Sequence, residues 1–307
     1  MNLTLRKIMT MSAVLGSLGL APHSYASAVD IQWLGGPTML IKFGSISLLT
    51  DPMLGEGDAA YRMGDPNEAF DLARGPRVKE HKRLTALPAL KLAQLDAVVI
   101  SHSHEDHFDQ TARALLSGNR PVIVPPADNS LVKGLGFTAP QPLAWGQQWR
   151  YQEGEYQVVI TALPAFHSES AQVAPLLGEG NGYWFEFIQG DARTSLYWMG
   201  DTFLTGPLKE WLAARPAPDI LVPHVGRVGT TGPLGQISMG AAEVIEAIQF
   251  VQPAYTLPIH HSTYELYLEP ISALATSAEA SGVSVDLPAV GSWMHYPQTS
   301  QLAGSQR

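Results

Sequence analysis

Three histidines and an aspartate lie close together in the segment Ser101-His102-Ser103-His104-Glu105-Asp106-His107. A neutral imidazole offers a nitrogen lone pair and a carboxylate offers an anionic oxygen, so the combination suits Zn²⁺ or a similar divalent ion. A solvated polar turn with incidental histidines is the alternative, but folding alone rarely requires so dense a cluster. The pattern therefore predicts a metal site formed by His102, His104, Asp106 and His107.

Other residues of the same types follow apolar segments further along the chain. They are His167, Asp201, His224, His260 and His261. Seven of the ten histidines lie at 102–107, 167, 224 and 260–261. Each of these positions follows a predicted strand, and α/β sheets present their chemistry at strand ends. This distribution favours metal binding over incidental placement.

The pattern of apolar residues predicts the elements that position these side chains. We expect strands at residues 29–34, 38–43, 45–49, 95–100, 121–124, 156–163, 183–188, 195–199, 220–222, 255–258 and 283–287, and helices at 108–116, 208–214, 239–250 and 271–280. This order fits a four-layer αββα sandwich, although periodicity alone also allows other α/β layouts. The long irregular stretch 54–92 is expected to cap the site.

The first residues of the chain have the pattern of a secretory signal peptide. Arg6 and Lys7 precede an apolar run that ends at Pro22, and small residues follow at 26–28. A buried first helix is the alternative. We therefore expect a signal peptide at 1–28 and export, most simply to a bacterial periplasm. The chain has no Cys, which excludes a lipoprotein anchor, a disulfide and a thiolate ligand.

Composition bounds the partners of the remaining chain, which we expect to form one domain over residues 29–307. Without residues 1–28 it has 17 Lys and Arg against 28 Asp and Glu, a net charge of −11. Because phosphate contacts need clustered basic residues, nucleic acid is a poor candidate partner. No segment there is long and apolar enough to span a membrane. A small-molecule substrate is expected, and the sequence does not predict the oligomeric state.

The His-x-His-x-Asp-His motif at 102–107 resembles the signature of the metallo-β-lactamase superfamily. Further segments resemble elements of that family, in order along nearly the whole mature chain. They are Trp33-Leu34-Gly35, Leu49-Thr50-Asp51-Pro52, Pro164-Ala165-Phe166-His167-Ser168, Trp198-Met199-Gly200-Asp201-Thr202 and Pro258-Ile259-His260-His261-Ser262-Thr263-Tyr264. The last resembles the ascorbate-6-phosphate lactonase-like branch, which is similar to the N-acyl-phosphatidylethanolamine phospholipase D type. The resemblance implies the four-layer αββα fold.

The resemblance also implies a set of ligands for two divalent metal ions. One ion would be bound by His102, His104 and His167. The other would be bound by Asp106, His107 and His260, and Asp201 would bridge both. Zn is the first expectation, with Mn and Fe as alternatives. His260 is favoured over His261, because neighbours on an extended segment point to opposite sides.

Two further residues have open roles, and one position departs from the family pattern. His224 either contacts the oxyanion or leaving group of a substrate or is a structural histidine. Asp51 either orients a ligand imidazole or is a turn residue before Pro52. Gly36 stands where the branch commonly has a histidine, which weakens the analogy of substrates.

The implied activity is metal-dependent hydrolysis of an ester, lactone or phosphodiester by a hydroxide shared between the two ions. Asp106 or Asp201 would orient the hydroxide and handle its proton. Asp201 argues against a true β-lactamase, since those enzymes usually lack the bridging carboxylate. An exported β-lactamase-like enzyme and a non-catalytic binding protein on the same fold are the alternatives. The binding protein predicts a lost ligand, and none is missing.

Overall fold

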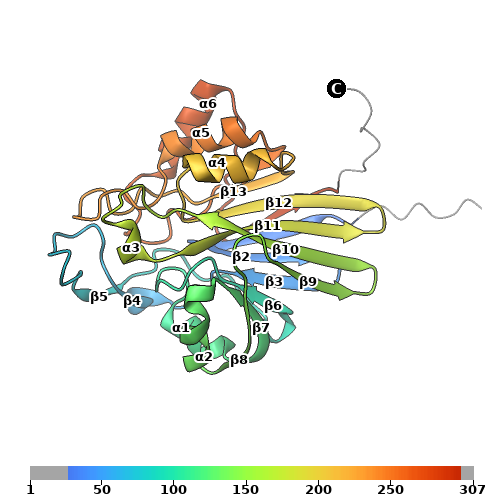
Figure 1. Ribbon diagram of the computed structural model, residues 1–307, viewed down its shortest axis with the longest axis horizontal. Helices are drawn as coiled ribbons and strands as arrows, with labels where there is room; N and C mark the ends of the chain where they lie inside the picture. The colour runs from blue at the N-terminus through green and yellow to red at the C-terminus, as the bar shows by residue number, and fades with distance from the viewer. Residues whose placement is uncertain (1–26, 299–307) are drawn as a thin grey trace, which may run out of the picture.

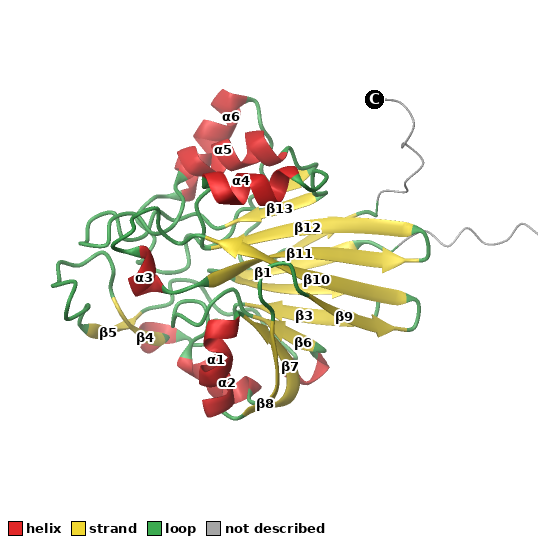
Figure 2. Cartoon of the chain, viewed as in Figure 1, coloured by secondary structure: helices red, strands yellow, loops and turns green. Residues whose placement is uncertain are grey.

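A computed structural model describes residues 27–298. Nearly all of the expected signal peptide at 1–28 therefore lies outside the described residues. Two large sheets lie face to face, with helices on both outer sides (Figures 1 and 2). The loops that join the strands gather at one end of the two sheets, beside a small two-stranded sheet.

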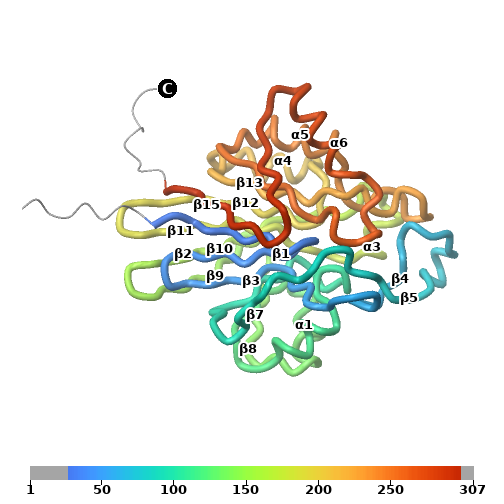
Figure 3. Tube along the Cα trace, turned by 180° about the vertical axis from the view of Figure 1, so that it is seen from behind, coloured from blue at the N-terminus to red at the C-terminus, as the bar shows by residue number. Residues whose placement is uncertain are grey.

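The first large sheet has seven strands in the order β15-β1-β2-β3-β6-β7-β8. Their bounds are β1 (Val29–Gly35), β2 (Thr38–Phe43), β3 (Ile46–Thr50), β6 (Ala97–Val99), β7 (Gly118–Val124), β8 (Phe137–Pro142) and β15 (Trp293–Tyr296). The strand β15 from the end of the chain pairs antiparallel with β1 from its beginning, as Figure 3 shows from behind.

The second large sheet has six strands in the order β14-β13-β12-β11-β10-β9. Their bounds are β9 (Gln148–Glu153), β10 (Tyr156–Ala165), β11 (Gly180–Gln189), β12 (Ala192–Gly200), β13 (Ile220–Pro223) and β14 (Tyr255–Thr256). Strands β12, β13 and β14 are parallel to one another, so their carboxyl ends lie at the same edge of the sheet.

The helices in the described residues are α1 (Gln110–Leu116), α2 (Asn129–Gly134), α3 (Ala174–Leu177), α4 (Gly206–Ala213), α5 (Ala241–Val251) and α6 (Ile271–Ser281), with short 3-10 turns at η1 (Gly57–Ala59), η2 (Leu92–Gln94) and η3 (Pro126–Asp128). Five of these helices, α1, α2, α4, α5 and α6, cover the outer faces of the two sheets, whereas α3 lies at the end where the loops gather (Figure 1). Within residues 27–298, no helix combines the length and the apolar character needed to cross a membrane.

Alternation of side chains along the strands builds separate apolar layers. Val29 and Ile31 of β1 meet Val158 and Ile160 of β10 in the core between the sheets. A second layer joins the outer face of the second sheet to α4, α5 and α6, and a third joins the first sheet to α1 and α2. These layers confirm the expected αββα sandwich, with the main core between the sheets.

Two expectations about local structure are wrong. The stretch 54–92 is not wholly irregular, because β4 (Tyr61–Gly64) and β5 (Val78–His81) form an antiparallel hairpin within it. No strand forms at 283–287. Val283 and Val285 instead pack against the apolar layer of α5 and α6. Their apolar side chains therefore contribute to packing around the helices and not to a β-strand.

The buried guanidinium of Arg83 ties the stretch 54–92 to the main fold. Arg83 is 4% exposed, and it donates to the carbonyl oxygen of Met53 at 3.1 Å and to the hydroxyl of Tyr264 at 3.0 Å. It also donates to the carbonyl oxygens of Leu34 and Thr85. Three backbone carbonyl oxygens and one hydroxyl thus take the place of a carboxylate partner. These hydrogen bonds join the stretch 54–92 to the segments that contain Leu34 and Tyr264.

We expect Arg83→Ala to lower the free energy of unfolding by about 3 kcal/mol, because buried acceptors lose their donor. Urea unfolding measures this change. Lys82→Ala is the matched control, since the neighbouring Lys82 side chain is 52% exposed and forms an ion pair with the exposed Asp58. Equal stability of the two variants would contradict a stabilising role for the hydrogen bonds of Arg83.

Candidate metal centre

The candidate ligands converge because they all follow strands at the same end of the two sheets. His102 and His107 lie in the loop between β6 and α1 of the first sheet. His167, Asp201, His224 and His260 follow β10, β12, β13 and β14 of the second sheet. The centre is therefore formed where the two sheets face each other, and every one of the sequence-predicted ligands lies at it.

His102, His104 and His167 form one group, in which one ring nitrogen from each residue lies within 4.8 Å of the others. The ring centroids of His102 and His104 are 4.4 Å apart, and those of His102 and His167 are 5.0 Å apart. Three imidazoles at this spacing match the number and type of ligands of a protein Zn site.

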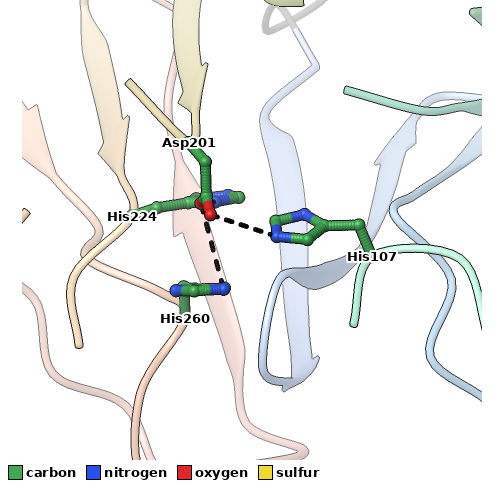
Figure 4. A group of neighbouring side chains, drawn as sticks. All are labelled: His107, Asp201, His224 and His260. Atoms are coloured by element: carbon green, nitrogen blue, oxygen red, sulfur yellow. Dashed lines mark hydrogen bonds and ion pairs between the residues drawn. The ribbon is translucent and has the colours of Figure 1, made fainter. Parts of the chain in front are cut away.

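A second group consists of His107, Asp201, His224 and His260, and its Asp201 also lies close to the first group. One oxygen of Asp201, Oδ2, is 3.5 Å from Nε2 of His167 and 3.3 Å from Nε2 of His107. The other oxygen, Oδ1, is 3.9 Å from Nε2 of His260. Figure 4 shows His107 approaching Asp201 from the side opposite His224 and His260. Asp106 borders the second group, with Oδ2 4.0 Å from Nε2 of His107.

Asp51 orients two of these imidazoles. Its Oδ2 is 2.7 Å from Nδ1 of His107, and it also accepts the hydroxyl of Ser101 at 2.6 Å. The hydroxyl oxygen of Ser101 lies 3.0 Å from Nδ1 of His102. Each ring therefore has its Nδ1 engaged and its Nε2 directed at the centre, which is the arrangement that fixes metal-binding histidines. Of the two roles considered for Asp51, the structure favours orientation of a ligand.

His224 is buried between a tryptophan and Asp201. The indole Nε1 of Trp198 donates to Nε2 of His224 at 2.7 Å, so the ring proton lies on Nδ1. Nδ1 in turn donates to Oδ1 of Asp201 at 2.7 Å. Since both ring nitrogens have protein partners, this geometry gives His224 a role through Asp201 rather than through a substrate. Sequence reasoning missed Trp198, which lies three residues before Asp201 but is brought to His224 only by the pairing of β12 and β13.

His260 and His261 differ in direction. His260 Nδ1 donates to the carbonyl oxygen of Val225 at 3.0 Å, and its Nε2 belongs to the second group. The ring of His261 packs on Trp33, with ring centroids 4.5 Å apart. The expected extended backbone is wrong here, because His260 has a left-handed φ of 67°. Such strain is typical of functional positions.

Gly36 has a packing role in place of the histidine that the branch commonly carries. Its carbonyl oxygen accepts the amide of His260 at 2.8 Å and the indole of Trp33 at 2.9 Å. A Cβ at this position would lie 3.0 Å from the ring of Tyr264 and 3.1 Å from the hydroxyl of Tyr267. A larger residue would therefore disturb the backbone that holds His260.

The electrostatics of the centre favour bound cations. Burial lowers the pKa of His104 to about 3 and the pKa of His102 and His260 well below the ordinary value, so these rings are neutral and offer lone pairs. Burial also lowers the pKa of His107, but the carboxylates of Asp201, Asp106 and Asp51 together raise it well above the ordinary value. Carboxylates that hold a proton on a buried imidazole would equally hold a metal ion.

The residues at the centre fit divalent metal ions. Nε2 of His102, His107 and His260 is buried without a hydrogen-bond partner. Buried polar atoms are rarely left unpaired, and one explanation of such a group is an ion. These three atoms are the ones that Asp51 and Val225 direct inward. Orphaned imidazole nitrogens and a central carboxylate are together the ligand chemistry of zinc and related metals.

We expect His224→Leu to weaken metal binding 10- to 100-fold, because Asp201 loses the donor that orients it. His224→Asn should stay within a few-fold of wild type, since the amide nitrogen can replace Nδ1. Both variants remove the acceptor of Trp198, so their difference isolates the bond to Asp201. Metal retained during dialysis against graded chelator is the measurement, and equal loss in both variants would sink this role.

Burial lowers the pKa of His261 to about 4, below the value of about 6.5 in an unfolded chain. Between pH 4 and 6.5 the unfolded chain therefore binds more protons, and stability is lost as the pH falls through this window. We expect His261→Gln to reduce the slope of unfolding free energy against pH there by up to about 1.4 kcal/mol per pH unit. Urea unfolding in chelator at several pH values measures it, and unchanged slopes would contradict a buried neutral His261.

Several known proteins are similar to this chain in sequence. A protein of Mycobacterium tuberculosis whose function is uncharacterised is 26% identical over 283 residues, which cover 88% of this chain and 70% of that protein. A UPF0173 metal-dependent hydrolase of Carboxydothermus hydrogenoformans is 28% identical over 191 residues, 62% of this chain and 77% of the relative. The N-acyl-phosphatidylethanolamine-hydrolyzing phospholipase D 1 of Caenorhabditis elegans is 23% identical over 268 residues, 83% and 71% of the two chains.

Solved structures share the fold. An isothiocyanate hydrolase from Delia radicum gut bacteria superposes with a TM-score of 0.70 at 23% identity, covering 87% of this chain and 99% of that one. A possible metal-dependent hydrolase from Veillonella parvula has a TM-score of 0.69 at 19% identity, covering 88% and 99%. The family model of the β-lactamase superfamily domain matches residues 48–261, which is more than half of the chain. The protein therefore belongs to the metallo-β-lactamase superfamily of metal-dependent hydrolases.

Proposed function

We propose that this hydrolase uses two divalent metal ions with Asp201 shared between them. His102, His104 and His167 would bind one ion, and Asp106, His107 and His260 the other. The observation that carries the proposal is the position of Asp201, whose Oδ2 lies 3.5 Å from His167 and 3.3 Å from His107, one histidine of each group. A single carboxylate oxygen within reach of both groups suits a bridging ligand.

Two divalent ions bound there would supply a hydroxide near neutral pH, because the pKa of a coordinated water falls from about 16 to about 7, and would polarise the bond under attack. The chain itself holds and moves the proton. Asp106 lines the cavity beside the centre, so its carboxylate would orient the hydroxide and accept the proton that the hydroxide gives up. His260 and His107, with a smaller contribution from His224, keep Asp201 ionised, and the hydrogen bond from His224 fixes its direction.

The bonds within reach of this chemistry are those of carboxylic esters, lactones and phosphodiesters. The similarity to a worm enzyme named for hydrolysis of a phospholipid supports keeping the phosphodiester in this set. The ascorbate-6-phosphate lactonase-like branch stays a proposal, as does zinc as the resident metal. Export to a periplasm, with residues 1–28 removed, also remains a proposal that rests on the sequence pattern alone.

We expect wild-type protein to contain about two equivalents of divalent metal and Asp201→Ala less than one, with kcat at least 100-fold lower. Plasma mass spectrometry measures the metal, and hydrolysis of p-nitrophenyl acetate and bis(p-nitrophenyl) phosphate measures the activity. Asp191→Ala is the control, because Asp191 is exposed in the turn between β11 and β12. EDTA should lower the melting temperature of wild type.

A wild type that stays metal-free after incubation with Zn and Mn, and whose melting temperature EDTA leaves unchanged, would overturn the proposal. A wild type with one equivalent that Asp201→Ala retains would instead contradict the shared carboxylate alone.

A further inference from the structure

A cavity of about 350 Å³ opens beside the metal centre. His104, Asp106, His167 and Asp201 form its polar floor. Its walls are mainly apolar and include Met63, Phe70, Leu72, Leu176, Leu234 and Ile237. The volume is at the lower end of the range for small-molecule sites, which run from about 300 to 1,000 Å³. The cavity therefore admits a small or medium-sized substrate whose reactive group lies on the floor.

The walls come from three segments that are far apart in the chain, namely 63–76, 174–177 and 228–237. Core packing explains part of this convergence, since Val228 and Ile237 are buried in one apolar cluster, but it does not explain two exposed side chains of the lining. Leu72 is 39% exposed and Leu176 is 56% exposed, although both line the cavity. By contrast, Tyr183 and Trp184, which follow α3 in the chain, are buried in the cores. A bound apolar group would remove Leu72 and Leu176 from water.

The charges around the cavity disfavour an anionic substrate. Among the described residues that line it there is no Lys or Arg, whereas Glu105, Asp106 and Asp201 are carboxylates. The cation nearest to Glu105 is Arg113, 3.6 Å from its carboxylate, and Arg113 does not line the cavity. The two bound ions would be the cations that an anionic group meets at this lining, and Asp106 and Asp201 would already offset part of their charge. An uncharged group needs no further cation from the lining.

We propose that the substrate is an uncharged carboxylic ester or lactone with an apolar acyl chain that lies against Leu72 and Leu176. This inference rests on the proposed hydrolytic function for its chemistry. One water adds to the acyl carbon and the acyl carbon–oxygen bond breaks. The water oxygen stays in the carboxylic acid, and one water proton goes to the departing alkoxide. Phosphodiesters are disfavoured because the described lining supplies no Lys or Arg for their negative charge.

The test uses metal-loaded, full-length protein and p-nitrophenyl esters from acetate to decanoate, with bis(p-nitrophenyl) phosphate for comparison. We expect kcat/KM to rise about threefold for each added methylene up to a length that fills the cavity, and the phosphodiester to be the poorest substrate. In the double variant Leu72→Ser/Leu176→Ser, the ratio of kcat/KM for the octanoate ester to kcat/KM for the acetate ester should fall at least tenfold, because KM for the octanoate ester rises. Leu115→Ser is the matched control, since Leu115 is 58% exposed on α1, away from the cavity.

Binding of the uncharged fluorescent probe N-phenyl-1-naphthylamine gives a readout that needs no turnover. Wild type and Leu115→Ser should bind it, and the double variant should bind it at least tenfold more weakly. Metal-dependent hydrolysis without chain-length preference, or with the phosphodiester preferred, would overturn this inference and leave the proposed function standing. If no ester or phosphodiester is hydrolysed, the proposed function falls, and equal probe binding by wild type and the double variant would then overturn the apolar site as well.

Discussion

A buried carboxylate is stable only where donors or cations surround it, and this constraint links Asp201 to the loops around the candidate metal centre. It is 5% exposed, and its oxygens face His107, His167, His224 and His260. Burial alone would raise the pKa of Asp201, but the imidazoles and their hydrogen bonds hold it well below the ordinary value. Since those imidazoles come from four different loops, the positions of the loops and the charge of Asp201 depend on each other.

The two sheets approach each other closely at this carboxylate. Gly200, which precedes Asp201, has a left-handed φ of 64°, and a Cβ there would lie 3.0 Å from the carbonyl oxygen of Asn181 and 3.2 Å from Cβ of Ser101. The amide of Asn181 also donates to the carbonyl oxygen of Ser101 at 2.8 Å. Glycine therefore allows the end of β12 to lie against the loop that carries His102. Without this contact the ligands of the first sheet could not reach Asp201.

The stretch 54–92 is fixed to the main fold near the candidate metal centre. Asp109, the N-cap of α1, accepts the amide of Ala112 at 2.6 Å and the amide of Gly55 at 2.7 Å. One carboxylate thus fixes both the helix that follows His107 and the start of the stretch 54–92. Arg83 fixes a later part of that stretch to the loop that follows His260. The part of the cavity wall that comes from this stretch is consequently positioned by Asp109 and Arg83, which contact the segments that carry His107 and His260.

From the sequence alone, the residue types of the candidate ligands could be predicted, and the family resemblance of its motifs implied the layered fold. The spacing within 102–107 is local, and the strands before His167 and Asp201 were readable from their apolar residues, so these positions needed no tertiary information. The tertiary structure decided which partner each side chain meets. The pairing of β12 with β13 brings Trp198 to His224, and the left-handed backbone at His260 turns His261 onto Trp33. Such contacts join residues that are distant in the chain or depend on a strained dihedral angle, and neither the choice of partner strand nor backbone strain can be read from the spacing of residues within one segment.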